Sequence, residues 1–239
     1  MRKLIKGIVD FRRSVLPDYR ETFARLALEQ KPDCLFIACS DSRVVPNLFA
    51  STEPGDLFVT RNVGNLVPPA GPGGFSTGDE AEAASIEYAV QALGVRDVVV
   101  CGHSSCGAMR TIVESAAGAP PLPASAAPNL SRWLRHGLPA LEKLEGGGRL
   151  EGRFDALPKH DALSQLNVLE QVGHVLSYPS VAERVADRAL GVHGWWFDIA
   201  SADVYAYEEM PRQFVLIDEA EAEHILARLP YTGGVQRRS

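Results

Sequence analysis

The sequence predicts an α/β fold in which a mostly parallel central sheet is flanked by helices, with a helical arm at the N-terminus. Two short runs, CLFIACS at 34–40 and RDVVVCGH at 96–103, are almost wholly apolar, as strands buried on both faces of a parallel sheet are. Strand and helix patterns alternate from residue 57 to residue 117, which is the order of a parallel α/β sheet. Residues 1–32 precede these strands and follow a helical period.

The arm is expected to contain two helical pieces. Its first apolar residues share one helix face, and the period resumes after Pro17, which interrupts it. We therefore divide the chain into an N-terminal helical arm at 1–32, an α/β domain at 33–229 and a C-terminal tail at 230–239. An arm of this kind suggests a homodimer.

The first half of the α/β domain follows in order. A turn at TEP leads into a second strand at 57–60. The Pro/Gly-rich segment 68–79 is expected to be a loop, because proline and glycine disfavour regular structure. A helix at 80–93 follows, ended by Gly94, and another helix at 106–117 follows the strand that contains RDVVVCGH.

The second half is predicted to be helical first and extended later. Its helices are expected at 130–144, 162–176 and 180–190. Its strands are expected at 192–200, 203–209 and 213–218, and they include a hairpin or a sheet edge.

Composition and charge disfavour two classes of binding partner. The net charge of −6 gives no electrostatic reason for binding nucleic acid. No apolar run approaches the ~20 residues of a membrane-spanning helix. Charged residues interrupt the basic N-terminal stretch, so it does not resemble a signal peptide. We expect a cytoplasmic protein with neither a nucleic-acid nor a membrane partner.

Three side chains at strand ends predict a metal site. Cys39 closes the first apolar strand, and His103 and Cys106 follow the end of the third. Open α/β sheets place their sites at the carboxyl ends of strands. Zinc binds thiolate and imidazole, and a catalytic zinc takes three protein ligands and leaves a fourth position for water. Cys106 also begins a predicted helix, where the helix dipole favours its thiolate.

The alternative is that these cysteines are small buried hydrophobic residues, which is the usual role of a single cytosolic cysteine. We assign Cys34 and Cys101 to the core in this way, because both lie inside apolar strands. A redox pair is less attractive, since the chain has no C-x-x-C sequence.

Asp41 and Arg43 lie in the loop that follows Cys39. An aspartate can coordinate zinc or accept a hydrogen bond from a zinc-bound water, and a guanidinium can hold that carboxylate with two hydrogen bonds. The pair therefore allows two states, in which Asp41 either is the fourth ligand or is held away from the metal. The alternative is a turn-capping aspartate beside a surface arginine.

Two motifs carry a family resemblance. CSDSR at 39–43 and GHSSCG at 102–107 resemble the C-x-D-x-R and H-x-x-C motifs of the β-class carbonic anhydrases. The resemblance extends through EPGDLFVTRNVGNLVPP, ASIEYAVQALGVRDVVVCGHSSCGAM and VHGWWFDI. It spans most of residues 30–200.

The resemblance implies a zinc-dependent carbonate dehydratase, a lyase. It implies reversible hydration of CO2 to bicarbonate and a proton by zinc-bound hydroxide. It also implies Zn2+ held by Cys39, His103 and Cys106, with Asp41 and Arg43 controlling the fourth position. The metal site would then belong to the 33–229 domain. The resemblance also implies a homodimer or a higher homo-oligomer, in which such helices wrap over a neighbouring copy.

Further resemblances concern the substrate pocket. Gln30 stands nine residues before Cys39, like a glutamine that orients substrate in plant-like members, although a surface glutamine is an equal alternative. Tyr88 is either a packed aromatic or a proton-relay group. Some bacterial members bind bicarbonate at a second site through Trp, Arg and Tyr, where this chain has Phe36, Arg61 and Phe197. We expect no such gating here.

Three other functions remain as alternatives. Relatives with similar motifs hydrolyse CS2 or COS. A non-catalytic zinc protein would use Asp41 as a permanent fourth ligand. A zinc deaminase is disfavoured, because its H-x-E and P-C-x-x-C sequences are absent.

Overall fold

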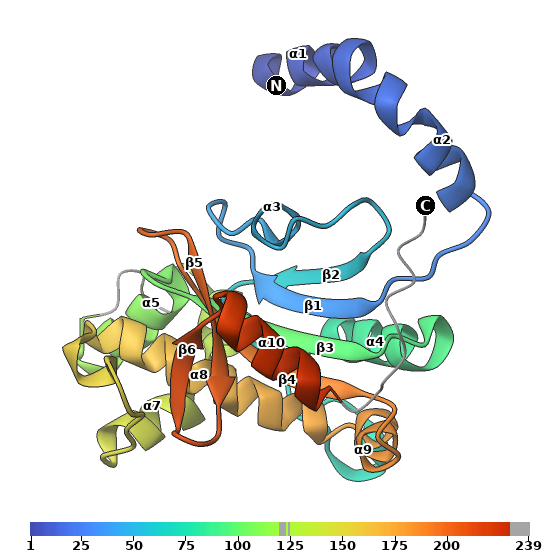
Figure 1. Cartoon of the computed structure of the whole chain (residues 1–239). Coiled ribbons are helices and arrows are strands. Elements are labelled where there is room, and N and C mark those ends of the chain that lie inside the picture. Colours follow the sequence, from blue (N-terminus) through green and yellow to red (C-terminus); the bar gives the residue numbers. More distant parts are fainter. Residues whose placement is uncertain (120–122, 124, 230–239) are drawn as a thin grey trace.

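The computed structural model describes residues 1–119, 123 and 125–229, so the predicted tail at 230–239 lies outside the described residues. Six strands form one sheet in the order β2-β1-β3-β4-β5-β6 (Figure 1). The first four pair in parallel, and β5 and β6 are added antiparallel. The strands are β1 (Cys34–Cys39), β2 (Leu57–Asn62), β3 (Asp97–His103), β4 (Gly191–Asp198), β5 (Asp203–Glu208) and β6 (Gln213–Leu216). The predicted, mostly parallel sheet with a late hairpin is confirmed.

One face of the sheet packs against α4 (Glu80–Glu87), α8 (Lys159–Leu176) and α9 (Pro179–Ala186). The helix that begins with α4 continues as a π-helical turn, Tyr88–Leu93, and ends at Gly94 in the left-handed conformation with φ 68°. A residue without a Cβ adopts this conformation at little cost. The predicted helix at 80–93 and its end are therefore confirmed.

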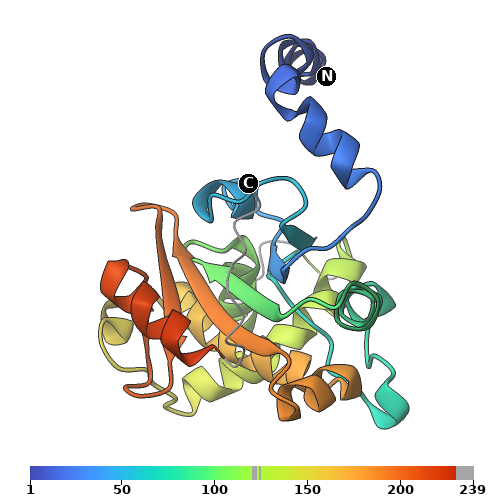
Figure 2. The same ribbon diagram turned by 45° about the vertical axis from the view of Figure 1, so that its right-hand side comes forward.

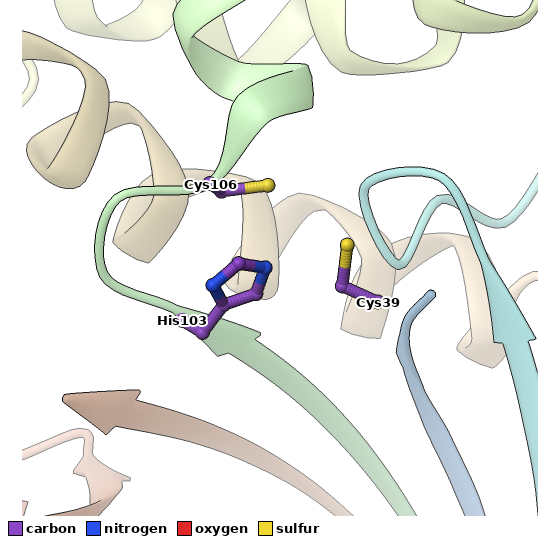
Figure 3. Close-up of side chains that lie close together, drawn as sticks. All are labelled: Cys39, His103 and Cys106. Carbon is purple, nitrogen blue, oxygen red and sulfur yellow. The ribbon is translucent and has the colours of Figure 1, made fainter. Parts of the chain in front are cut away.

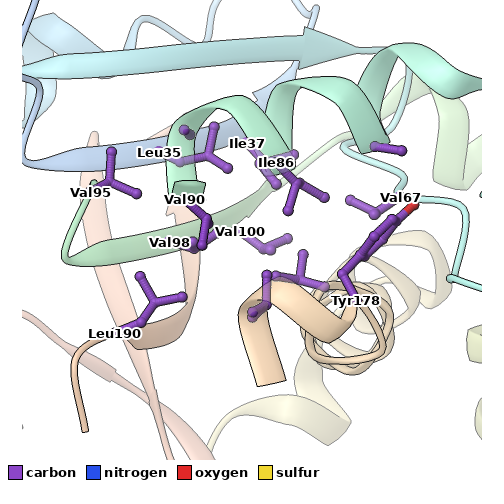
Figure 4. Close-up of a cluster of buried hydrophobic side chains, with 14 of the residues drawn as sticks. Leu35, Ile37, Val67, Ile86, Val90, Val95, Val98, Val100, Tyr178 and Leu190 are labelled. Carbon is purple, nitrogen blue, oxygen red and sulfur yellow. The ribbon is translucent and has the colours of Figure 1, made fainter. Parts of the chain in front are cut away.

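Alternate side chains along β1 and β3 point to this face of the sheet and form the hydrophobic core there. Leu35 and Ile37 of β1 lie beside Val98 and Val100 of β3 (Figure 4), and all four are at most 1% exposed. Tyr178 closes the cluster from the start of α9 and is fully buried. The strands carry apolar residues toward both faces, which is why their sequences are almost continuously apolar.

The opposite face of the sheet carries an aromatic cluster. Phe49, from the short helix α3 (Pro46–Phe49), stacks on Phe197 with ring centroids 4.7 Å apart. Phe36 lies edge-on to Trp195 at 5.9 Å. These rings fix the segment that follows β1 against the sheet.

At the carboxyl ends of β1 and β3, a second group of helices packs around α8. They are α5 (Gly107–Ala116), α6 (Pro128–Leu134) and α7 (Leu138–Glu145). The single helix predicted at 130–144 is wrong, because a 3-10 turn at Arg135–Gly137 divides it. Pro139 explains the division, since it lacks an N–H and occupies the first turn of α7. Other 3-10 turns lie at Pro72–Gly74 and Phe154–Ala156.

The last helix, α10 (Glu219–Arg228), was not predicted. Asp218 caps it by accepting a hydrogen bond from the Glu221 N–H at 2.9 Å. Arg228 anchors it to the sheet through two hydrogen bonds to Glu208 of β5, at 2.7 and 2.6 Å. Asp218 followed three residues later by Glu221 is a helix-start pattern that could have revealed this helix.

The N-terminal arm projects from the body of the chain (Figures 1 and 2). It contains α1 (Arg2–Asp10), a π-helical segment (Phe11–Val15) and α2 (Leu16–Leu26), and none of these has a buried residue. The interruption expected near Pro17 is instead the π-helical segment, with the proline in the first turn of α2. Exposed apolar side chains line the arm: Leu4, Ile5, Ile8, Val9, Phe11, Val15 and Phe23. In the described part of the chain, no helix has the length and apolar character needed to cross a membrane.

Candidate metal centre

The ends of two neighbouring strands bring three candidate ligands together. Cys39 is the last residue of β1, His103 is the last of β3, and Cys106 immediately precedes α5. Because β1 and β3 pair in parallel, their carboxyl ends lie side by side. The three ligand atoms lie within 4.8 Å of one another, and the sulfur atoms and the imidazole ring converge in Figure 3. All three residues are buried.

The hydrogen bonds of His103 suit a metal ligand. Its Nδ1 lies 2.9 Å from the Ser104 carbonyl oxygen, which places the ring proton on Nδ1. Its Nε2 is buried and has no hydrogen-bond partner among the residues that the structure describes. A buried ring nitrogen is normally paired, and metal-bound histidines commonly donate their other N–H to a carbonyl. The residues present therefore fit a zinc ion.

The two thiols share a proton. Hydrogen bonds from the Cys106 thiol and from the Gly64 N–H, which lies 3.4 Å from the Cys39 sulfur, lower the pKa of Cys39 to about 4. The pKa of Cys106 is raised, because its thiol donates to Cys39 and is buried. Without a metal, the pair therefore holds one thiolate and one thiol near neutral pH. A cation that binds both sulfurs must displace the proton of Cys106.

Asp41 faces Arg43 in a two-pronged pair. Arg43 Nε donates to Asp41 Oδ1 at 2.9 Å, and its Nη2 donates to Oδ2 at 2.7 Å. The Arg43 backbone N–H also donates to Oδ1 at 3.0 Å. These hydrogen bonds, led by those of the guanidinium, hold the pKa of Asp41 well below its usual range. Asp41 is thus an anion whose two oxygens are both engaged.

Arg61, on β2, donates hydrogen bonds to the backbone of the segment that contains Cys39 and Asp41. Its Nε donates to the Cys39 carbonyl oxygen at 3.0 Å, and its Nη2 donates to the Asp41 carbonyl oxygen at 2.7 Å. The sequence suggested Arg61 only as a remnant of a second bicarbonate site, so this contact was missed. Arg61 lies on β2, a strand at the edge of the sheet. Nothing in the sequence around it indicates that its side chain reaches the loop that follows β1.

Comparison with known proteins assigns the family. The family model for carbonic anhydrase matches residues 34–204. A carbonic anhydrase of Pseudomonas aeruginosa is 43% identical over 223 residues, which cover 92% of this chain and 93% of the relative. This chain belongs to the β-carbonic anhydrase family. The solved β-carbonic anhydrase CcaA superposes with a TM-score of 0.80 at 35% identity and 92% coverage of each chain. A chain from the crystal structures of two tetrameric β-carbonic anhydrases of Sordaria macrospora gives a TM-score of 0.69 at 28% identity, with 86% of this chain and 95% of that chain covered.

Family membership confirms the main functional predictions. The chain is a lyase of the carbonic anhydrase type, and its reaction is the zinc-dependent reversible hydration of CO2. Zinc is the cofactor, and the cluster of Cys39, His103 and Cys106 is able to bind it. The resemblance of the CSDSR and GHSSCG motifs thus led to the correct family.

Two further candidates, Gln30 from the resemblance and Tyr88 from its predicted helix, lie away from the metal centre within one chain. Gln30 precedes β1, whereas Cys39 ends it. The first and last residues of β1, Cys34 and Cys39, are about 16 Å apart, so Gln30 lies beyond the end of the strand opposite to Cys39. Tyr88 packs against Phe58 near the start of β2 with ring centroids 5.8 Å apart, and it is 49% exposed. The role of Gln30 remains a prediction.

The other residues singled out from the sequence lie in the core. Phe36 and Phe197 are buried in the aromatic cluster with Phe49, and neither ring offers a hydrogen bond. The absence of bicarbonate gating remains a prediction. Cys101 is fully buried, as expected, and Cys34 is partly buried on the same face of the sheet.

Proposed function

We propose that Cys39, His103 and Cys106 hold the catalytic zinc, and that Arg43 keeps Asp41 away from the metal so that water takes the fourth position. The supporting observation is the two-pronged pair, in which both Asp41 oxygens accept hydrogen bonds from Arg43. When bound, zinc supplies the Lewis acidity that makes water nucleophilic enough to attack CO2.

The residues around the metal have separate roles in this proposal. Asp41 accepts a hydrogen bond from the attacking water and orients it, because its anionic oxygens lie in the loop that carries Cys39. Arg43 fixes the direction of that carboxylate. The site differs from a closed structural zinc site, in which Asp41 would be a fourth ligand.

Measurement of bound metal tests the ligand set. We expect about one zinc per chain in the wild-type protein and a large loss in Cys39→Ser, because a hydroxyl is a poor zinc ligand. Cys34→Ser is the matched control, since Cys34 lies five residues away on the same strand and outside the cluster. Equal zinc content in the two variants would contradict the assignment.

We propose that the enzyme is a homo-oligomer built on arm exchange between two copies. The arm exposes its apolar side chains and buries none, which is unfavourable for a lone chain in water. The Sordaria macrospora relatives are tetrameric. Deletion of residues 1–26 should convert the protein to a smaller species in light scattering, and an unchanged mass would refute the arm's role.

We propose that Gln30 acts on the zinc site of a second copy, since it cannot reach its own. Hybrid oligomers test this. A Gln30→Ala chain retains its zinc ligands, and a Cys39→Ser chain retains Gln30. Mixing them should restore activity above that of either variant alone, because one site then has both parts. Activity equal to the average of the two variants would refute the proposal.

We propose a reducing compartment, the cytoplasm, as the location. None of the four cysteines forms a disulfide, and the zinc site needs two of them as thiolates. Fractionation of cells that express the protein, with antibody detection, tests this.

A further inference from the structure

The loop that carries two of the ligands contains a strained residue. Ser105 lies between His103 and Cys106 and has φ +54°, a left-handed conformation that is uncommon for a residue with a side chain. Such residues persist when their surroundings hold them, and they concentrate at functional sites. The direction of the Cys106 side chain depends on this conformation, because Cys106 is the next residue.

Two charged side chains hold Ser105 from opposite sides. Its backbone N–H donates to Asp161 Oδ1 at 2.6 Å. Its carbonyl oxygen accepts from Arg43 Nη2 at 3.1 Å. Both peptide groups that flank the Ser105 α-carbon are therefore fixed by charge-assisted hydrogen bonds, which are stronger than neutral ones.

The first half of the loop has its own anchors. The Ser104 hydroxyl donates to Asp198 Oδ1 at 2.9 Å, and the Ser104 N–H donates to the Phe197 carbonyl oxygen at 2.9 Å. Ser164 donates to the His103 carbonyl oxygen at 2.9 Å. None of these three contacts reaches the Ser105 peptide groups. His103 Nδ1 contacts the Ser104 carbonyl oxygen of one of them at 2.9 Å, but the Ser105 N–H of the same group is held by Asp161.

Asp161 is a buried acidic residue that accepts this hydrogen bond from Ser105. It lies in the first turn of α8 and is 7% exposed. Its Oδ1 also lies 3.5 Å from Nε2 of His160. A buried carboxylate is costly unless it is hydrogen-bonded, and the short bond to Ser105 supplies that compensation.

We propose that Asp161 is a positioning residue of the zinc site. It holds Ser105 in the left-handed conformation, which aims the Cys106 sulfur at Cys39 and His103 and presents the Ser105 carbonyl oxygen to Arg43. Asp161 thereby supports both the third ligand and the arginine that holds Asp41. The inference rests on the proposed ligand set and adds a residue that touches neither the metal nor the substrate.

The test measures zinc affinity by competition with a chromophoric chelator. Loss of an outer-shell partner typically weakens metal binding about 10- to 100-fold, and we expect this in Asp161→Ala. Asp161→Asn should recover most of the affinity, because its amide oxygen still accepts from Ser105. Asp155→Ala is the control, since Asp155 is 78% exposed and pairs only with Arg149 among its charged contacts in the described residues.

The same substitution in a Ser105→Gly variant distinguishes a positioning role of Asp161 from a role in the stability of α8. Gly adopts the left-handed conformation without a clamp, so in Ser105→Gly protein the effect of Asp161→Ala should fall to less than about threefold. When Ser105 is unchanged, Asp161→Ala should alter the visible spectrum of the cobalt-substituted protein, and Asp161→Asn should give a spectrum like that of the wild type. Amide exchange at Ser105 in the metal-free protein should also accelerate in Asp161→Ala.

Two results would overturn the inference. One is zinc affinity and a cobalt spectrum unchanged in Asp161→Ala. The other is an affinity loss that is the same in the Ser105→Gly background and is not recovered by Asp161→Asn, which would place the effect in α8 as a whole. Retention of zinc by Cys39→Ser would instead contradict the ligand set itself, so the two failures are distinguishable.

Discussion

Removal of the Arg43 side chain should release Asp41. It also removes the hydrogen bond to the Ser105 carbonyl oxygen, whereas the three zinc ligands and the contact of Asp161 with the Ser105 N–H remain. In Arg43→Ala, Asp41 loses the hydrogen bonds at 2.9 and 2.7 Å from the guanidinium and keeps the one from the backbone N–H. The freed carboxylate remains an anion near neutral pH, because removing Arg43 raises the pKa of Asp41 only toward its ordinary acidic value. It can then compete with water for the metal.

The size of the effect follows from the geometry. A hydrogen bond to a charged group contributes about 1.5–3 kcal/mol, and two are lost. Side-chain exposure is 48% for Arg43 and 16% for Asp41, so solvent screening reduces the total to about 2 kcal/mol. This corresponds to about a 30-fold fall in the ratio of paired to released Asp41. We expect kcat/KM to fall by up to that factor.

Stopped-flow CO2 hydration, expressed per bound zinc, measures the effect. Arg43→Lys should lie between the wild type and Arg43→Ala, because an ammonium group keeps the charge but cannot hold two carboxylate oxygens in a planar fork. Wild-type kcat/KM in zinc-loaded Arg43→Ala would refute the reasoning, since the pair would then have no influence on the fourth position.

Two further predictions concern metal linkage and packing. The lowered pKa of Cys39 and the raised pKa of Cys106 mean that zinc displaces about one thiol proton, so chelator competition from about pH 7 to about pH 8 should show affinity rising about tenfold per pH unit. Two ordinary thiols would give a hundredfold rise, and that slope would contradict the shared proton. Gly102→Ala should destabilise the protein by about 1–3 kcal/mol in urea unfolding, because its Cβ would lie 2.6 Å from a Val168 methyl group. Gly173→Ala has open space and lies inside α8, so it should stabilise by about 0.5–1 kcal/mol, and equal effects of the two substitutions would refute the packing argument.

The sequence was most informative where a single local segment determines the structure. The apolar runs that contain Cys39 and His103 could be assigned to parallel strands, because burial on both faces leaves a continuous apolar pattern. Their adjacency then followed from the carboxyl-edge rule for open sheets. The ligand cluster was therefore predictable from residues that lie at the ends of strands.

Contacts between distant segments left no such pattern. Asp161 meets Ser105 across 56 residues, and Arg61 reaches the Cys39 carbonyl oxygen from another strand. Both contacts involve backbone atoms, which carry no residue identity. The position of Gln30 relative to its own zinc site likewise depends on the direction of β1, which is not visible in a spacing of nine residues.

Some predicted helix boundaries were wrong, because local features that the apolar periodicity does not reveal alter single turns of the helices. The helix predicted at 130–144 has a regular apolar spacing on both sides of Pro139, so the division at Arg135–Gly137 was hidden. In the arm, a π-helical turn at Phe11–Val15 lets the chain remain helical up to Pro17. Periodicity reports which face is apolar and is less sensitive to a single altered turn.

Zinc-dependent catalysis at the cluster of Cys39, His103 and Cys106 is tested by stopped-flow CO2 hydration on protein whose zinc content has been measured. The rate should rise in proportion to bound zinc up to about one ion per chain, should be higher at about pH 8.5 than at about pH 7, and should be lost in Cys39→Ser. Protein that carries one zinc per chain and shows no hydration at either pH would contradict zinc-dependent catalysis at this cluster.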